Sequence, residues 1–335
     1  PCLDYTVRIA EIAGIRPLLP PYAAIGAYSF TGNPDELIKW LAALPAGTDY
    51  LIISLDMLAY GGLVASRLPD TPLETAEARL AALQSFAESH PRTKVFAFGT
   101  IQRIARTATG IPAEDAATNL IAEYLKKADE AEATGNAILR QNLRSMKAAL
   151  PKGRLDEYFA ARARNHEINR RSIALLQSGA IDYLVIAMDD NAPYGPHRAE
   201  RDTLQKLLAD SGAADRGIIK PGADEVAQLL VARALHDHAG AAPKFAVGYY
   251  TEAAENWTPP LEDRPLSVSV PQALEIAGIG VPKRNEKPDA YLMVYGTSFA
   301  PGSETERSTI DKLTRDTAAL IAKGRLAGIA DLRFV

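Results

Sequence analysis

The sequence has a single cysteine, Cys2, among its 335 residues. This count excludes an internal disulfide and any zinc cluster built from several cysteines. No stretch reaches about 18 consecutive apolar residues, so the sequence predicts no membrane-spanning helix. The net charge is -4 and the charges of one sign form no long block. We therefore expect neither a membrane nor a nucleic acid as a partner.

Several common enzyme motifs are also missing. The chain has no Gly-x-Gly-x-x-Gly sequence and no phosphate-binding Gly-Lys-Ser/Thr loop, so nothing in it indicates a nucleotide site. It has no Gly-x-Ser-x-Gly sequence, which weakens a serine-hydrolase hypothesis. The remaining composition, 47% apolar and 23% charged, is typical of a soluble globular protein. We expect a cytoplasmic location, with export as the alternative because the sequence begins at Pro1; the oligomeric state is not predicted.

Short, nearly continuous apolar runs predict buried strands. Such runs suit strands that are covered on both faces, as in parallel sheets. The clearest runs cover residues 50–55, 183–188 and 290–295, and the weaker ones cover 94–98, 217–220, 244–250 and 329–335.

Helical patterns separate these runs, which is typical of βα units and a parallel sheet. The longest helical stretch has breaks at Gly135 and at residues 151–153. We predict one α/β domain over residues 1–335, with a helical insertion at about 112–178. An incomplete (β/α)8-like barrel is favoured because polar residues recur directly after the strands. An open doubly wound parallel sheet is the alternative.

A polar, glycine-containing segment follows the first strand. It contains Asp56, Tyr60, Gly61, Gly62 and Arg67. Glycines let the backbone approach a ligand closely, and arginine suits a carboxylate or phosphate. We predict that these residues bind substrate. The structural alternative is that Asp56 caps the following turn and pairs with Arg67.

Two adjacent carboxylates follow the strand at 183–188. Like charges this close raise the pKa of one acid, which provides a proton donor. We predict that Asp189 orients or stabilises the reacting group, that Asp190 is the general acid–base, and that Asn191 and Tyr194 bind substrate. In one alternative, the acids and Asn191 only satisfy loop amides. In another, Asp189, Asp190 and His197 hold a divalent metal, the one cofactor that we consider.

Two further sets of residues are weaker candidates for substrate binding. Asp224 and Glu225 lie where a short strand meets a helix. They could bind substrate, or they could stabilise the helix through the favourable interaction of acidic groups with its N-terminal dipole. Trp257 lies in a proline-rich loop and is the better of two tryptophans for stacking on a sugar ring.

The residues Ser54–Arg67 (SLDMLAYGGLVASR) resemble the signature of an uncharacterised bacterial domain-of-unknown-function family. The blocks DDNAPYG at 189–195 and PGADE at 221–225 resemble its later motifs. Members of that family usually have a Leu-Asp-x-Arg-Pro turn before the position of Pro1, and they continue beyond Val335. The resemblance implies a chain truncated at both ends, and it implies no established activity.

The adjacent acids are also similar to the pair in barrel glycosidases that act on N-acetylhexosamines. In those enzymes one carboxylate orients the substrate's acetamido group and its neighbour protonates the leaving oxygen. This likeness implies a hydrolase with a carbohydrate or other small-molecule substrate, by analogy of fold. The alternatives are a metal-dependent hydrolase that uses the same acids with His197, and a non-catalytic sugar-binding protein.

Overall fold

The computed structural model describes residues 2–27, 30–104, 112–189, 191–259, 262–297 and 299–332. Contacts divide the chain into two compact units. We call residues 15–227 the first unit, and residues 3–14 with 228–335 the second unit. None of the described helices is both long enough and apolar enough to cross a membrane.

The first unit is built on a four-stranded parallel sheet. Its strands pair in the order of the chain, from β1 to β4. All six residues of β3 are buried, as the continuous apolar run predicts for a strand covered on both faces. The strands are β1 (Tyr50–Ser54), β2 (Lys94–Ile101), β3 (Tyr183–Met188) and β4 (Gly217–Pro221).

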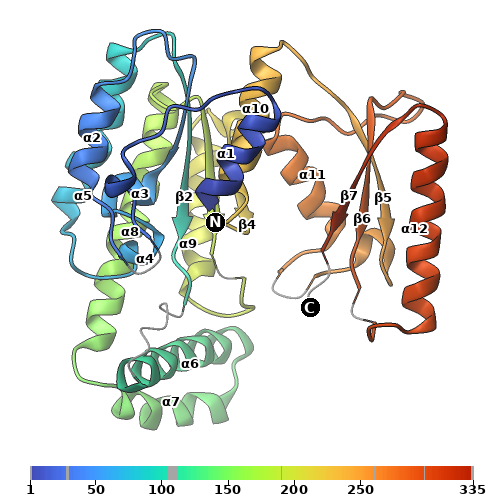
Figure 1. The fold of residues 1–335 in the computed structure, drawn as a ribbon. Coiled ribbons are helices and arrows are strands. Elements are labelled where there is room, and N and C mark those ends of the chain that lie inside the picture. Colours follow the sequence, from blue (N-terminus) through green and yellow to red (C-terminus); the bar gives the residue numbers. More distant parts are fainter. Residues whose placement is uncertain are drawn as a thin grey trace. The chain divides into compact units, whose positions relative to one another are not determined.

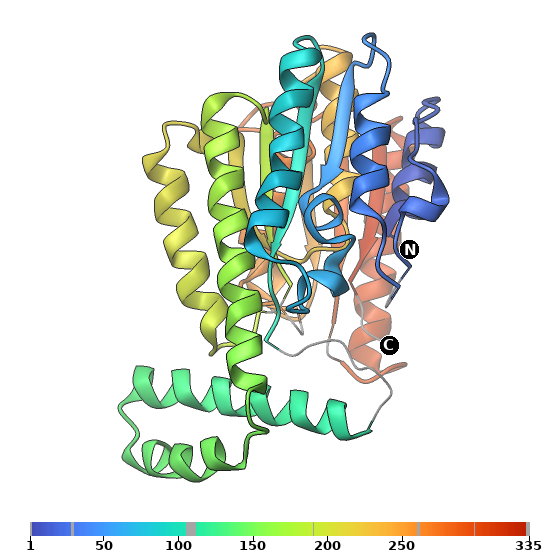
Figure 2. The ribbon, with the colours of Figure 1, turned by 90° about the vertical axis from the view of Figure 1, so that its left-hand side faces the viewer.

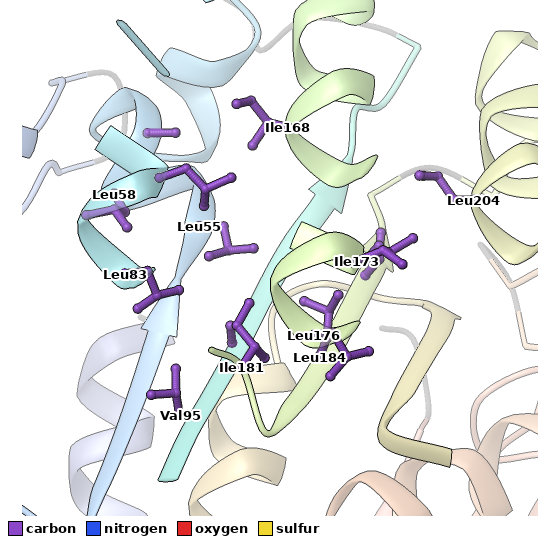
Figure 3. Close-up of a cluster of buried hydrophobic side chains, with 14 of the residues drawn as sticks. Leu55, Leu58, Leu83, Val95, Ile168, Ile173, Leu176, Ile181, Leu184 and Leu204 are labelled. Carbon is purple, nitrogen blue, oxygen red and sulfur yellow. The ribbon is translucent and has the colours of Figure 1, made fainter. Parts of the chain in front are cut away.

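Helices α2, α5, α8 and α9 cover one face of this sheet (Figure 2). The main core lies between the sheet and these helices, where Leu83, Leu176 and Leu184 are almost completely buried (Figure 3). The helices are η1 (Tyr22–Ala24), α2 (Pro34–Ala42), α3 (Leu55–Tyr60), α4 (Leu63–Ser66), α5 (Leu73–Ser89), α6 (Pro112–Thr134), α7 (Ala137–Ala149), α8 (Arg154–Ser178), α9 (Pro196–Asp210) and η2 (Ala214–Arg216).

Helices α6 and α7 form a hairpin beyond the carboxyl ends of the strands (Figures 1 and 2). A small apolar cluster joins it to the rest of the unit, with Ile121 and Leu125 of α6 packing beside Ile104 and Tyr158. The breaks between α6, α7 and α8 fall at Gly135 and at residues 151–153, where the sequence predicts them.

The second unit contains a three-stranded parallel sheet, in which β6 lies between β5 and β7. Two apolar clusters pack on this sheet, and one of them includes Leu313 of α12. The elements are α1 (Cys2–Ile12), most of α10 (Val226–His238), β5 (Phe245–Tyr250), η3 (Ala254–Asn256), α11 (Leu266–Ile276), β6 (Ala290–Tyr295), α12 (Glu304–Ala322) and β7 (Leu326–Asp331).

The fold is α/β, with parallel strands connected by helices. Within each sheet the strand order follows the chain, and neither sheet shows the reversal of order that defines a doubly wound sheet. The seven described strands lie in two sheets, one of four strands and one of three. Apolar runs identify buried strands, but they do not say which strands become neighbours.

Candidate functional site

Asp56 lies at the carboxyl edge of the first sheet, immediately after β1. Ser54 caps helix α3, because its Oγ accepts a hydrogen bond of 3.2 Å from the backbone N–H of Met57. The first turn of α3 therefore carries Asp56 directly beyond the strand. The alternative that Asp56 itself is the cap is wrong.

The Asp56 side chain is buried, with only 6% of the residue exposed. Thr100, near the end of β2, donates a hydrogen bond of 2.9 Å from its Oγ1 to Asp56 Oδ2. The pKa of Asp56 is raised from 3.8 to about 7: burial is the largest cause and the charge of Asp189 adds to it, against the lowering effects of Thr100 and Arg67. Asp56 is thus an acid that titrates near neutral pH.

Asp189 follows β3 at the same edge of the sheet. Its Oδ2 accepts a hydrogen bond of 2.5 Å from Nη2 of Arg67, and only 4% of the arginine side chain is exposed. Burial raises the pKa of Asp189, against the opposing effects of Arg67 and Arg103. Arg67 therefore pairs with Asp189, and not with Asp56 as the structural alternative had it.

The structure brings together residues that are far apart in the sequence. The charges of Asp189 and Arg67 both act on the pKa of Asp56, which places the three groups in one electrostatic cluster. β2 lies between β1 and β3, and all three strands run parallel. Their carboxyl ends therefore meet at one edge, as expected for sites in parallel sheets.

Helix α8 supplies buried polar residues that hold this cluster. Arg164 donates hydrogen bonds of 2.9 Å to the carbonyls of Leu68 and Thr71, and it also bonds the carbonyl of Ser66. Its guanidinium lies 4.5 Å from the centre of the Tyr60 ring. Tyr60 is therefore packed against Arg164, and burial raises the pKa of its hydroxyl.

Little in the sequence indicates that Arg164 supports the site. Arg164 lies in a helix with many charged residues, where an arginine is ordinarily solvated. Thr100 and Gln102 at the end of β2 occupy the same kind of position as Asp56 and Asp189. Their place at a strand end was the one signal that could have identified them.

The end of β4 carries another ion pair. Lys220 is 3% exposed and bonds both Glu225 Oε1 and the carbonyl of Gly222, the latter at 3.0 Å. A side chain at Gly222 would lie 2.8 Å from the Glu225 carboxylate, so glycine leaves room for this pair. Helix α10 begins at Val226, so Glu225 lies directly before the helix and pairs with Lys220. Asp224 acts on the site through its charge, which raises the pKa of Asp189.

The loop after β3 contains the remaining candidates of the first unit. His197 is buried, and its Nε2 lies 2.9 Å from the carbonyl oxygen of Ala192. Arg198 lies over the Tyr194 ring at 5.7 Å, and Asn191 is partly buried. Asp190 lies outside the described residues, so its role stays a prediction.

The two glycines after α3 have structural tasks. Gly61 ends α3 with φ at +85°, and its carbonyl accepts a hydrogen bond of 2.8 Å from the N–H of Gly32. A Cβ at Gly61 would lie 2.6 Å from the Gly32 oxygen. Gly62 has φ at +139° and is the residue directly before α4. This close backbone approach explains Gly61 without a ligand.

We expect Gly61→Ala to lower the free energy of unfolding by about 2–3 kcal/mol, because it adds overpacking to the strain of a left-handed alanine. Gly179→Ala is the matched control, since Gly179 also ends a helix, with φ at +83°, and has no atom near its Cβ position. It should cost about 1 kcal/mol. Urea unfolding measures both, and equal losses would contradict the packing argument.

Trp257 belongs to the second unit. It is 6% exposed and packs with Leu266 and Val294. A Cβ at Gly296 would lie 2.3 Å from its ring, so the indole fills a space in the core. This burial does not support the predicted stacking of Trp257 on a sugar.

The family described as "Protein of unknown function (DUF4127)" matches residues 1–335. The chain belongs to this family. It matches no curated protein and no solved structure. Membership in DUF4127 agrees with the expected resemblance to an uncharacterised family, and it assigns no activity.

The described part of this DUF4127 chain contains no group of three or more His, Cys, Asp and Glu side chains that could hold a metal ion. The proposed metal set of Asp189, Asp190 and His197 includes one residue outside that part. What the described site offers is proton transfer and charge stabilisation: Asp56 titrates near neutral pH, and Asp189 is held by Arg67.

Proposed function

We propose that the chain is a hydrolase of a glycoside or related sugar derivative, with its active site at the carboxyl edge of the first sheet. The observation that carries the proposal is the pair of Asp56 and Asp189. These acids are distant in the sequence, interact electrostatically at one sheet edge, and have different partners. Pairs of acids in unequal environments are typical of acid–base catalysis.

The two environments suggest which acid carries the proton. The hydrogen-bond partner of Asp56 is the neutral Thr100, and burial holds its pKa at about 7. The partner of Asp189 is the permanently charged Arg67, which favours the ionised form. In this proposal protonated Asp56 donates to the leaving glycosidic oxygen, while anionic Asp189 stabilises or orients the reacting group. Asp190, given the proton-donor role from the sequence, is the other candidate acid.

Assays of turnover test the proposal. We expect the chain to hydrolyse at least one member of a panel of 4-nitrophenyl glycosides that includes N-acetylglucosaminides. Asp56→Asn and Asp189→Asn should each reduce kcat/KM by about 100-fold or more, as expected for loss of a proton donor or a charge stabiliser. Asp210→Asn is the control, because Asp210 is exposed at the end of α9 and its loss should leave the rate unchanged.

The pH profile gives a second readout. A general acid must be protonated, so the wild-type rate should fall as the pH rises above about 7, the pKa of Asp56. The residual rate of Asp56→Asn should lack this alkaline decline. Undiminished turnover in both variants would remove the proposed roles, and sugar binding without any product would favour a binding protein.

A further inference from the structure

A series of hydrogen bonds fixes the orientation of the Gln102 amide. Arg164 donates from Nε and Nη2 to Asn165 Oδ1, at 3.1 and 2.9 Å. These bonds identify the other atom of the Asn165 amide as the nitrogen, Nδ2. It donates to the carbonyl of Ser66 at 2.8 Å and to Gln102 Oε1 at 3.0 Å. The Gln102 nitrogen, Nε2, is consequently the end of the series, and it is a donor.

This terminal donor is buried and has no acceptor. Only 2% of Gln102 is exposed, and its Nε2 makes no hydrogen bond in the part of the chain that the structure describes. Turning the amide over would not help, because Asn165 would then face a second donor. A buried donor without a partner costs about 1–3 kcal/mol. An acceptor supplied by a bound ligand or ion is one explanation for such a group in a native structure.

Arg103 is the neighbouring residue, and its guanidinium is in a similar state. Its Nε is buried without a hydrogen-bond partner, and no ion pair is formed by Arg103 within the described ranges. Its charge nevertheless reaches Asp189, whose pKa it lowers. Two other cations described at this edge are already matched, Arg67 by Asp189 and Lys220 by Glu225.

The backbone that carries both donors is firmly held. Arg162 of α8 donates from Nη1 to the carbonyls of Gln102 and Arg103, at 2.9 and 3.2 Å. Its other nitrogens bond both carboxylate oxygens of Glu200, at 2.7 and 2.6 Å. Donors on such a fixed segment lose little freedom when a ligand binds, which favours affinity.

We propose that Gln102 Nε2 and the Arg103 guanidinium form a subsite for an anionic group of the substrate, a carboxylate or a phosphate. Both groups offer several acceptor oxygens, and arginine can bind two of them at once. The inference extends the proposed function by narrowing the substrate class to an acidic or phosphorylated sugar. Only one part of the inference rests on the proposed function, namely that the bound anion belongs to the substrate.

Equilibrium binding tests the subsite separately from turnover. The full 335-residue chain is titrated by calorimetry with glucuronate, inorganic phosphate and, as the uncharged comparison, glucose. We expect at least one of the two anions to bind at least 10-fold more tightly than glucose. Tighter binding of glucuronate would identify a carboxylate as the ligand group, and tighter binding of phosphate would identify a phosphoryl group.

Three variants locate the binding. Arg103→Met should weaken binding of the preferred anion by at least 10-fold, and Gln102→Glu should weaken it because an acceptor replaces the donor while Asn165 keeps its bond. Arg92→Met is the matched control: Arg92 is exposed just before β2, at the opposite end of the strand, and should leave the affinity unchanged. If Gln102→Glu fails to fold, Arg103→Met and Arg103→Lys decide the result, with partial retention expected in the lysine variant.

The outcomes separate this inference from the proposed function. Loss of anion binding in Arg103→Met supports the subsite even if no glycoside is hydrolysed. Equal affinity of wild type and Arg103→Met, or no preference for either anion over glucose, overturns the subsite. In that case hydrolysis of neutral glycosides would leave the proposed function intact.

Discussion

Asp56→Asn should stabilise the protein more at pH 8 than at pH 4. The quantity compared is the free energy of unfolding of the variant minus that of the wild type at each pH. The wild-type side chain is buried beside Thr100, and burial raises its pKa from 3.8 to about 7. Asparagine is neutral at every pH and can still accept the hydrogen bond from Thr100. The substitution therefore removes the cost of ionising a buried carboxylate.

The sign follows from the two pKa values. Below about pH 4, Asp56 is protonated in both the folded and the unfolded chain, so its ionisation costs nothing. Between pH 4 and 7 the unfolded chain releases the proton more readily, and the wild type loses stability as the pH rises. At about 1.4 kcal/mol per pKa unit, the stability of Asp56→Asn relative to the wild type should rise by about 2–4 kcal/mol from pH 4 to pH 8.

Urea unfolding at the two pH values measures this change. Taking the difference between variant and wild type at each pH removes the contributions of titrating groups that do not interact with Asp56. Asp210→Asn is again the control, and should change the unfolding free energy by less than about 0.5 kcal/mol at either pH. If the stability of Asp56→Asn relative to the wild type falls from pH 4 to pH 8, the fold depends on ionised Asp56.

A gain in stability together with a loss of turnover would distinguish a functional acid from a structural one. Replacing a residue that serves stability lowers the free energy of unfolding. Replacing a strained active-site group can raise the free energy of unfolding while activity is lost. The structural tasks near Asp56 are already carried out by other groups: Ser54 caps α3, and Arg67 pairs with Asp189. What remains for Asp56 in the proposal is chemistry.

The sequence predicted the local structure well because local patterns determine it. The apolar run at 183–188 became a strand that is buried at every position. The long stretch without strand signals became α6, α7 and α8, separated where glycine and proline break the pattern. The polar residues after β1 and β3 came to one edge because parallel strands end on the same side.

The sequence pattern did not predict which distant residues and strands contact one another. The local pattern offered Asp56 as the partner of Arg67, and the structure gives Asp189, which lies 122 positions away. The division of seven strands into two sheets has the same origin, since an apolar run carries no information about its neighbour. Burial of α8 residues such as Arg164 depends on what packs against the helix, so propensity and charge could not reveal it.

Arg164→Met should lower the free energy of unfolding by about 2–5 kcal/mol, because each buried carbonyl left without a donor costs about 1–3 kcal/mol. Methionine fills much of the same space, but it leaves the carbonyls of Leu68 and Thr71 without their Arg164 donor, whereas the carbonyl of Ser66 keeps its bond from Asn165. It also removes the cation from the Tyr60 ring. These contacts hold the segment that carries Arg67, the residue that pairs with Asp189. Arg164 therefore contributes both to the stability of the fold and to the position of Arg67.

Two variants on the same helix make the Arg164 test specific. Arg171→Met removes a half-exposed arginine that pairs with Glu77 and Glu167, and should cost less than about 1 kcal/mol. Arg164→Lys keeps the charge but cannot reach three carbonyls with one ammonium, so it should fall between the two. Urea unfolding at pH 7 measures all three. A cost for Arg164→Met no larger than that for Arg171→Met would show that α8 does not hold the Ser66–Thr71 segment, and that Arg67 is positioned by its pair with Asp189.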